Sequence, residues 1–213
     1  MRKYITFGIV MSLIFGLTGK CTVAKATECE DKILCSMGYH SFHDSYLSTS
    51  DGKLHGKRYV YISKKFQNQS SKGLIAAGFT NWNISGNEKV RLAETSDFDN
   101  CQIYIVPENL EGDVNGITYY RRRAGNKLTS DVDNLGENYI YSRIEINENL
   151  CQSRGILTKV TTHECGHALG LSHVTCRESI MYPASSSKKM LDTPSNLDKA
   201  TMCHVYGVSY SYK

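Results

Sequence analysis

The chain has 213 residues, a formal net charge of +4 and eight cysteines. This length suffices for one domain with a hydrophobic core, and we find no repeats or low-complexity tracts that would indicate a repeat protein or a disordered chain. The positive charge comes partly from the local run Arg121–Arg123, which is typical of a solvated loop, so the charge does not indicate a nucleic-acid partner.

The first 26 residues have the pattern of a secretory signal peptide. Two basic residues precede an uncharged run over residues 4–17, which is too short to cross a bilayer comfortably, so we expect no stable membrane span. The small-x-small sequence at residues 24–26 predicts cleavage before Thr27 and a secreted, extracellular protein. The alternative is a lipid anchor at Cys21, although Lys20 stands where a lipoprotein signal has a small residue.

The cysteine content fits an oxidising compartment, in agreement with a signal peptide. Cleavage would remove Cys21, and Cys165 is expected on the buried side of its helix, about 200° around the axis from His163. The six other cysteines allow fifteen pairings, among which the sequence does not decide. As hypotheses, we pair Cys176 with Cys203, Cys101 with Cys151, and Cys29 with Cys35.

Residues 27–57 are polar and rich in turn-forming residues, which predicts an irregular N-terminal segment, with a short propeptide as the alternative. Residues 58–213 then have the patterns of one domain. Alternating hydrophobicity predicts strands over residues 58–63, 90–94, 102–106, 117–120 and 139–146. Helical patterns predict a helix from Ser70 or Ser71 to Trp82, a second over residues 156–169, and a third from Pro194 to Gly207.

Two of these segments carry polar groups of further interest. Between residues 131 and 137 lie several oxygen-bearing side chains, which predict a solvated turn, with a calcium site as the alternative. In the strand over residues 139–146, alternation places isoleucines on one face and polar or aromatic residues on the other. The second face consists of Tyr139, Tyr141, Arg143 and Glu145.

The residues with the clearest chemistry lie at the end of the second predicted helix. His163 and His167 are four residues apart, so both imidazoles lie on the same helical face and can bind a single ion. Glu164 lies beside that face, where a carboxylate can take a proton from a metal-bound water. Gly170 can end the helix and turn the chain, so that His173 completes a three-histidine zinc site.

The pattern H-E-x-x-H-x-x-G-x-x-H, followed by Ser179-Ile180-Met181-Tyr182-Pro183, resembles the metzincin metallopeptidases and is most similar to their matrixin branch. The resemblance implies an α+β, zincin-like fold. In this fold a twisted mixed sheet packs on a central zinc-binding helix, followed by a methionine turn and a C-terminal helix.

The resemblance also implies the reaction, which is hydrolysis of an extended peptide or protein substrate by a zinc endopeptidase. One zinc ion, held by His163, His167 and His173, would activate a water molecule, and Glu164 would act as the general base. Met181 would form an apolar floor beneath the histidines. We expect a monomer. The alternative function is a zinc-binding or lipid-anchored surface protein without catalysis, against which the intact glutamate argues.

In the resembled family, an edge strand next to the cleft pairs with the substrate. We assign this role to the strand over residues 139–146, with an internal strand as the alternative. This predicts substrate contacts at Tyr139, Tyr141, Tyr182 and Pro183.

The chain departs from the matrixin pattern at three points. It has no P-R-C-G-x-P-D cysteine switch, and Cys176 stands where matrixins have an aspartate. It also has no histidine between His55 and His163, so we do not expect the second, structural zinc ion of that family.

Overall fold

The computed structural model describes residues 46–66, 68–122, 128–129, 138–151, 153–183 and 191–210. The predicted signal peptide, the calcium alternative over residues 131–137, Cys21, Cys29 and Cys35 lie outside these ranges. Within them the strands are β1 (Gly56–Ile62), β2 (Val90–Glu94), β3 (Ile103–Pro107), β4 (Gly116–Arg122), β5 (Leu128–Thr129) and β6 (Tyr139–Ile146). The helices are α3 (Gln69–Thr80), α4 (Arg154–Ala168) and α5 (Asn196–Val205). No helix in the described ranges is long and apolar enough to cross a membrane.

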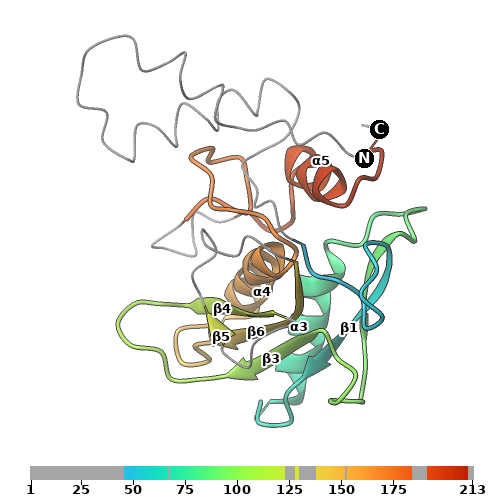
Figure 1. Ribbon diagram of the computed structural model, residues 1–213. Coiled ribbons are helices and arrows are strands. Elements are labelled where there is room, and N and C mark those ends of the chain that lie inside the picture. The colour runs from blue at the N-terminus through green and yellow to red at the C-terminus, as the bar shows by residue number, and fades with distance from the viewer. Residues whose placement is uncertain are drawn as a thin grey trace, which may run out of the picture.

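The strands form one mixed sheet in the order β2-β1-β3-β6-β4-β5. The first four of these strands are parallel, whereas β4 is antiparallel to both β6 and β5. Helix α4 packs on β4 and β6 with α3 beside it, and α4 lies between the sheet and α5 (Figure 1). The predicted α+β fold with a mixed sheet and a central helix is therefore confirmed.

The sheet order contradicts the edge role predicted for residues 139–146. Strand β6 lies inside the sheet, with β3 on one side and β4 on the other. Strand β5 is outermost in this half of the sheet, and within the described residues it pairs with β4 only at Tyr120 and Arg121. The internal-strand alternative is the correct one.

Side-chain caps fix the helix starts. Helix α3 begins earlier than predicted because Asn68, rather than Ser70 or Ser71, is the cap, and its side chain accepts a hydrogen bond of 2.9 Å from the Ser70 amide. Helix α5 begins with a capping box, in which Ser195 and Asp198 each bond the other's backbone amide. After this helix Gly207 has a φ of 59°, consistent with the predicted end.

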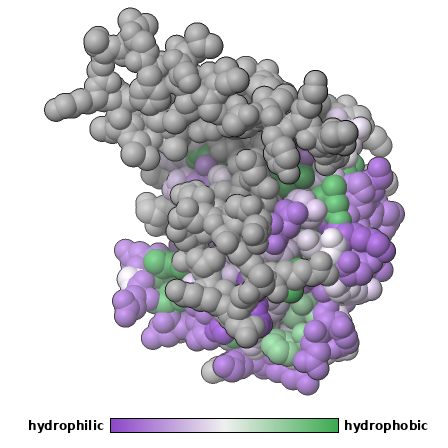
Figure 2. Space-filling model, in the orientation of Figure 1, coloured by the Kyte–Doolittle hydropathy of each residue, from purple (hydrophilic) through white to green (hydrophobic). Residues whose placement is uncertain are grey.

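The core lies between the sheet and α4. Trp82 is almost completely buried, and its indole nitrogen donates a hydrogen bond of 2.8 Å to the Thr162 carbonyl, which links the end of α3 to α4. Cys165 is fully buried on α4, as predicted. In the view of Figure 2 the described part of the surface is mainly hydrophilic, with small hydrophobic spots. Among the described residues the large hydrophobic side chains lie mostly inside, and the exposed ones are Tyr59, Phe98, Val114 and Leu150.

Two of the three hypothetical disulfides fall in the described ranges, and neither is formed, because all five cysteines there are free thiols. The topology explains why Cys101 cannot reach Cys151. Strands β3 and β6 run in the same direction, Cys101 precedes the first and Cys151 follows the second, so the two thiols lie at opposite ends of the sheet. Cys203 instead contacts the Asn87 side chain.

The residues before β1 pack into the domain through a buried arginine. Arg58 is fully buried, and it donates hydrogen bonds to the backbone carbonyls of Leu47, Leu54 and Gly56 at 2.5–3.0 Å. Its guanidinium lies 4.6 Å from the centre of the Tyr206 ring, after α5. Leu47 is also fully buried. Arg58 therefore joins the N-terminal segment, the sheet and the C-terminal helix.

Replacing Arg58 with methionine should lower the free energy of unfolding by about 3 kcal/mol, because several buried carbonyls lose a charged donor. Thermal or urea unfolding measures the loss. The matched control is Arg91→Met, since Arg91 is half exposed on β2 and pairs with Glu88 at the surface. That change should stay within about 1 kcal/mol. Equal losses in the two variants would contradict the role assigned to Arg58.

Candidate metal centre

Helix α4 and the turn after it bring three histidines together. His163 and His167 are buried on α4, and Gly170, which follows the C-cap residue Leu169, has a φ of 96°. The Gly170 amide bonds the His167 carbonyl at 2.8 Å, and the Leu171 amide bonds the Gly166 carbonyl at 3.0 Å. This pair of bonds is a Schellman motif, which needs a residue in the left-handed conformation. The turn reverses the chain and brings His173 back to the helix.

The Nε2 atoms of the three histidines converge. They are 3.1 Å apart between His163 and His167, 3.1 Å between His167 and His173, and 3.2 Å between His163 and His173. Nitrogen ligands about 2.0 Å from one zinc ion are separated by about this distance in a tetrahedral site. The three atoms thus have the spacing of a three-histidine zinc site with one position left open.

The other ring nitrogens decide which tautomer faces the centre. Nδ1 of His163 lies 2.7 Å from the Ile180 carbonyl, and Nδ1 of His167 lies 2.9 Å from the Leu171 carbonyl. A carbonyl oxygen can only accept, so each Nδ1 carries the proton and donates it. The Nε2 lone pairs then point at one another, which is unfavourable unless a cation lies between them. These residues therefore fit a metal ion.

Desolvation favours the neutral form of His163 and His173. Loss of solvent lowers the pKa of His163, opposed by its bond to the Ile180 carbonyl. His173 keeps an exposed edge, but its ring lies against the other two, and desolvation followed by the His163 charge lowers its pKa to about 4. Neutral imidazole is the form that binds metal, so little proton release is needed at neutral pH.

Glu164 lies between α4 and β4. Its Oε2 accepts a hydrogen bond of 2.7 Å from the Thr118 hydroxyl, and the residue is only 6% exposed. Burial raises the pKa of Glu164 to about 7, and the bond from Thr118 opposes this rise. A carboxyl group with this pKa can both accept and release a proton near neutral pH.

The methionine turn, which contains Met181 and follows His173 in the chain, packs against α4 at Gly166. Met181 is fully buried, and a methyl group added at Gly166 would collide with its sulfur and come within 2.8 Å of the Trp82 ring. The turn is held by Asp198 of α5, whose carboxylate accepts from the Ser179 hydroxyl at 2.5 Å and from the Ile180 amide at 3.1 Å. Since the Ile180 carbonyl bonds His163, Asp198 is connected to the metal centre through one residue.

Comparison with known proteins now adds the family. A family model described as matrixin matches residues 63–207, which is more than half of the chain and includes all three histidines. The chain belongs to the matrixin family. It is accordingly a zinc metalloendopeptidase, as predicted from the motif.

Among solved structures, the matrixin chain is similar to high choriolytic enzyme 1, a hatching enzyme zinc-protease from the medaka fish Oryzias latipes. The two share 13% sequence identity over 78% of this chain and 95% of that chain, with a TM-score of 0.46. No curated protein matches the chain.

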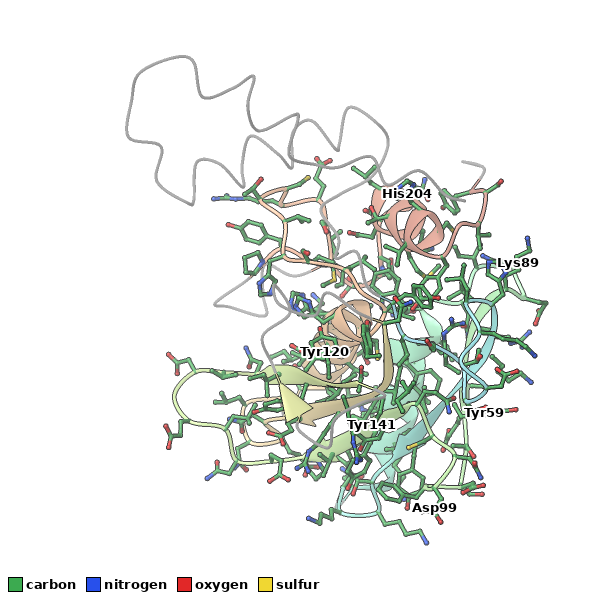
Figure 3. All side chains as sticks on the ribbon, viewed as in Figure 1. Tyr59, Lys89, Asp99, Tyr120, Tyr141 and His204 are labelled. Atoms are coloured by element: carbon green, nitrogen blue, oxygen red, sulfur yellow. The ribbon has the colours of Figure 1, made fainter. Side chains whose placement is uncertain are left out.

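The two tyrosines of β6 do not lie at the metal centre of this matrixin. Tyr139 is fully buried, and its hydroxyl donates a hydrogen bond of 3.0 Å to the Ala168 carbonyl. Tyr141 lies on the face of the sheet opposite α4, whereas Tyr120 of the neighbouring strand points towards α4 (Figure 3). The structure therefore does not place either tyrosine where the predicted substrate contacts at the metal centre would be made.

The other two predicted substrate residues lie on the turn that supports the histidines. Tyr182 is half buried with the Arg177 guanidinium 6.0 Å from its ring centre, and Pro183 is exposed. Their contacts with a substrate remain a prediction. Most of the loop that follows, residues 184–190, lies outside the described ranges.

Three residues near the centre were not predicted from the sequence. Thr118 and Gly116 lie on β4 against Glu164, and Asp198 bonds the methionine turn. For Asp198 a signal was present, because a serine followed three residues later by an acidic residue predicts a capping box. No sequence signal identifies Thr118 and Gly116, since their role depends on which strand lies beside α4.

Proposed function

We propose that this matrixin is secreted and cleaves internal peptide bonds of proteins, with His163, His167 and His173 as zinc ligands and Glu164 as general base. The observation that carries the proposal is the convergence of three histidine Nε2 atoms within 3.2 Å of one another. Secretion is supported by the signal-peptide pattern of residues 1–26.

The chain's own residues then have separate tasks. His163 and His167 hold their rings in a fixed orientation through the carbonyls of Ile180 and Leu171, so that the ligand set is preorganised. Zinc, when bound, supplies a Lewis acid that polarises the scissile carbonyl and lowers the pKa of water. The Glu164 carboxylate takes the proton of the attacking water and passes it to the nitrogen of the leaving amine.

The substrate strand would lie beside β4 rather than β6. Strand β4 pairs with β6 on one side, and on the other side, among the residues that the structure describes, only Tyr120 and Arg121 are paired, with β5. Residues 116–119 therefore have an edge to which an extended peptide can add by backbone hydrogen bonds. Residues of this edge lie against Glu164, and the scissile bond has to lie next to Glu164. Met181 has the separate task of forming an apolar floor under the histidines.

Removing the metal tests the proposal. We expect residues 27–213 to degrade casein or gelatin, to lose this activity completely when a chelator removes zinc, and to regain it when Zn²⁺ is restored. Zymography and a fluorogenic peptide assay measure the effect. Calcium added alone to the metal-free protein is the control and should not restore activity. A protein that binds one zinc ion but never cleaves any substrate of a peptide library would show that it is a zinc-binding protein instead.

A further inference from the structure

The Glu164 side chain lies against two residues of β4 that share one face of the strand. Gly116 and Thr118 are two positions apart, so both face α4. The Thr118 hydroxyl lies 2.7 Å from Oε2 of Glu164 and 3.1 Å from the backbone carbonyl of the same residue. One hydroxyl group thus contacts both the side chain and the main chain of Glu164.

The glycine leaves space for the rest of the carboxylate. A methyl group added at Gly116 would lie 2.9 Å from Cγ and 3.1 Å from Oε1 of Glu164, and 3.0 Å from Val160 on the preceding turn of α4. These separations are shorter than ordinary van der Waals contacts. Since Gly116 is not among the glycines with positive φ, the backbone accepts alanine there, and the constraint is the space beside Glu164.

The two contacts involve different oxygens of the same carboxylate. Thr118 bonds Oε2, whereas Oε1 lies on the side of Gly116, where a methyl group would come within 3.1 Å of it. A buried carboxylate can rotate about its side-chain bonds unless a neighbour fixes it, and rotation moves the oxygen that accepts the proton. Strand β4 is also the strand beside which we place the substrate, so the same element would orient the base and the peptide.

We propose that Thr118 and Gly116 are positioning residues for the general base. Thr118 holds Oε2 of Glu164 in one orientation, and the missing side chain at Gly116 keeps Oε1 accessible to the attacking water. The inference depends on the proposed role of Glu164 as the base. A static packing role would instead need only the volume and the methyl group of Thr118.

Three substitutions separate these roles. Thr118→Val keeps the shape but removes the hydroxyl, and should lower kcat about 10- to 100-fold, because a misplaced catalytic group costs about this much, with KM within about twofold of wild type. Thr118→Ser keeps the hydroxyl and should retain at least about a third of kcat. Gly116→Ala should lower kcat in the same way as Thr118→Val. Gly73→Ala is the matched control, because nothing lies within 4 Å of the added methyl group, and kcat should not change.

Two measurements do not depend on catalysis. Zinc affinity, measured by competition with a chelator, should stay within about twofold for all these variants, since the contacts that Thr118 and Gly116 make are with Glu164 and Val160. In the metal-free protein, Thr118→Val should lower the melting temperature, and the decrease should be smaller in a Glu164→Ala background, because the hydrogen bond to the side chain is already lost there.

The outcomes distinguish failure of this inference from failure of the proposed function. If Glu164→Gln retains full proteolysis, Glu164 is not the base and the proposed function fails. If Glu164→Gln is inactive while Thr118→Val has wild-type kcat, only the positioning role fails. The positioning role would also be overturned if kcat fell equally in Thr118→Ser and Thr118→Val, because side-chain volume would then explain the effect. A loss of bound zinc in parallel with kcat would overturn it too, because metal binding would then explain the effect.

Discussion

Replacing Glu164 with glutamine should reduce kcat for peptide hydrolysis by a factor of about 10² to 10⁴ without unfolding the protein or releasing zinc. Glutamine has nearly the same volume and can still accept a hydrogen bond from Thr118, but its amide cannot take a proton from water. The residue is not one of the three converging histidines, so zinc content should stay at one ion per chain. Kinetics with a fluorogenic peptide and metal analysis of the same sample measure both effects.

The control for this prediction is Glu88→Gln. Glu88 is exposed in the loop before β2, and its ion pair with Arg91 lies at the surface. Its replacement should leave kcat unchanged. The mechanism is wrong if Glu164→Gln hydrolyses the peptide as fast as this control does.

Replacing Asp198 with alanine should lower the free energy of unfolding by about 3 kcal/mol. The carboxylate is fully buried and accepts hydrogen bonds from the backbone amides of Ile180 and Ser195, at 3.1 and 2.8 Å. Both amides would lose their acceptor, and α5 would lose its capping box, which alone contributes about 1 kcal/mol. For a domain of this size, we expect the melting temperature to fall by roughly 6–12 °C.

The same variant should also weaken zinc binding. Ile180 bonds Asp198 through its amide and His163 through its carbonyl, so a loosened turn allows the histidine ring to rotate. Loss of such outer contacts typically lowers metal affinity by about 10- to 100-fold. Asp99→Ala, at an exposed position labelled in Figure 3, is the matched control and should change stability by no more than about 0.5 kcal/mol. A zinc affinity equal to that of this control would contradict the coupling.

The sequence predicted those parts of the fold that depend on local patterns. The strand containing Val90 to Glu94 and the helix containing His163 follow from periodicity, because a repeat of two or of 3.6 residues sets which side chains face the core. The turn at Gly170 could also be predicted, since only a residue that tolerates positive φ ends a helix in this way.

Long-range pairing could not be predicted in the same way. The alternation in residues 139–146 placed Tyr139 with Tyr141 on the outer face, but the register shifts between Arg121 and Arg122, so that they pair with Tyr141 and Tyr139. Ile140 therefore has no partner in this register, and the side chain of Tyr139 faces the core. The pattern of one strand also does not reveal which strands lie beside it in the sheet. The position of β6 inside the sheet and the distance between Cys101 and Cys151 both depend on that order.

The buried Arg58 also restricts how the enzyme can mature. Its guanidinium is satisfied by carbonyls of Leu47, Leu54 and Gly56, so trimming of the chain up to residue 57 would leave a buried charge without these acceptors. Any cut that removes a pro-segment and leaves a stable enzyme should therefore fall before Leu47. Mass spectrometry of the N-terminus of the active protein would locate it. The mature enzyme would thus keep the residues between Leu47 and β1, although none of them belongs to the zinc site.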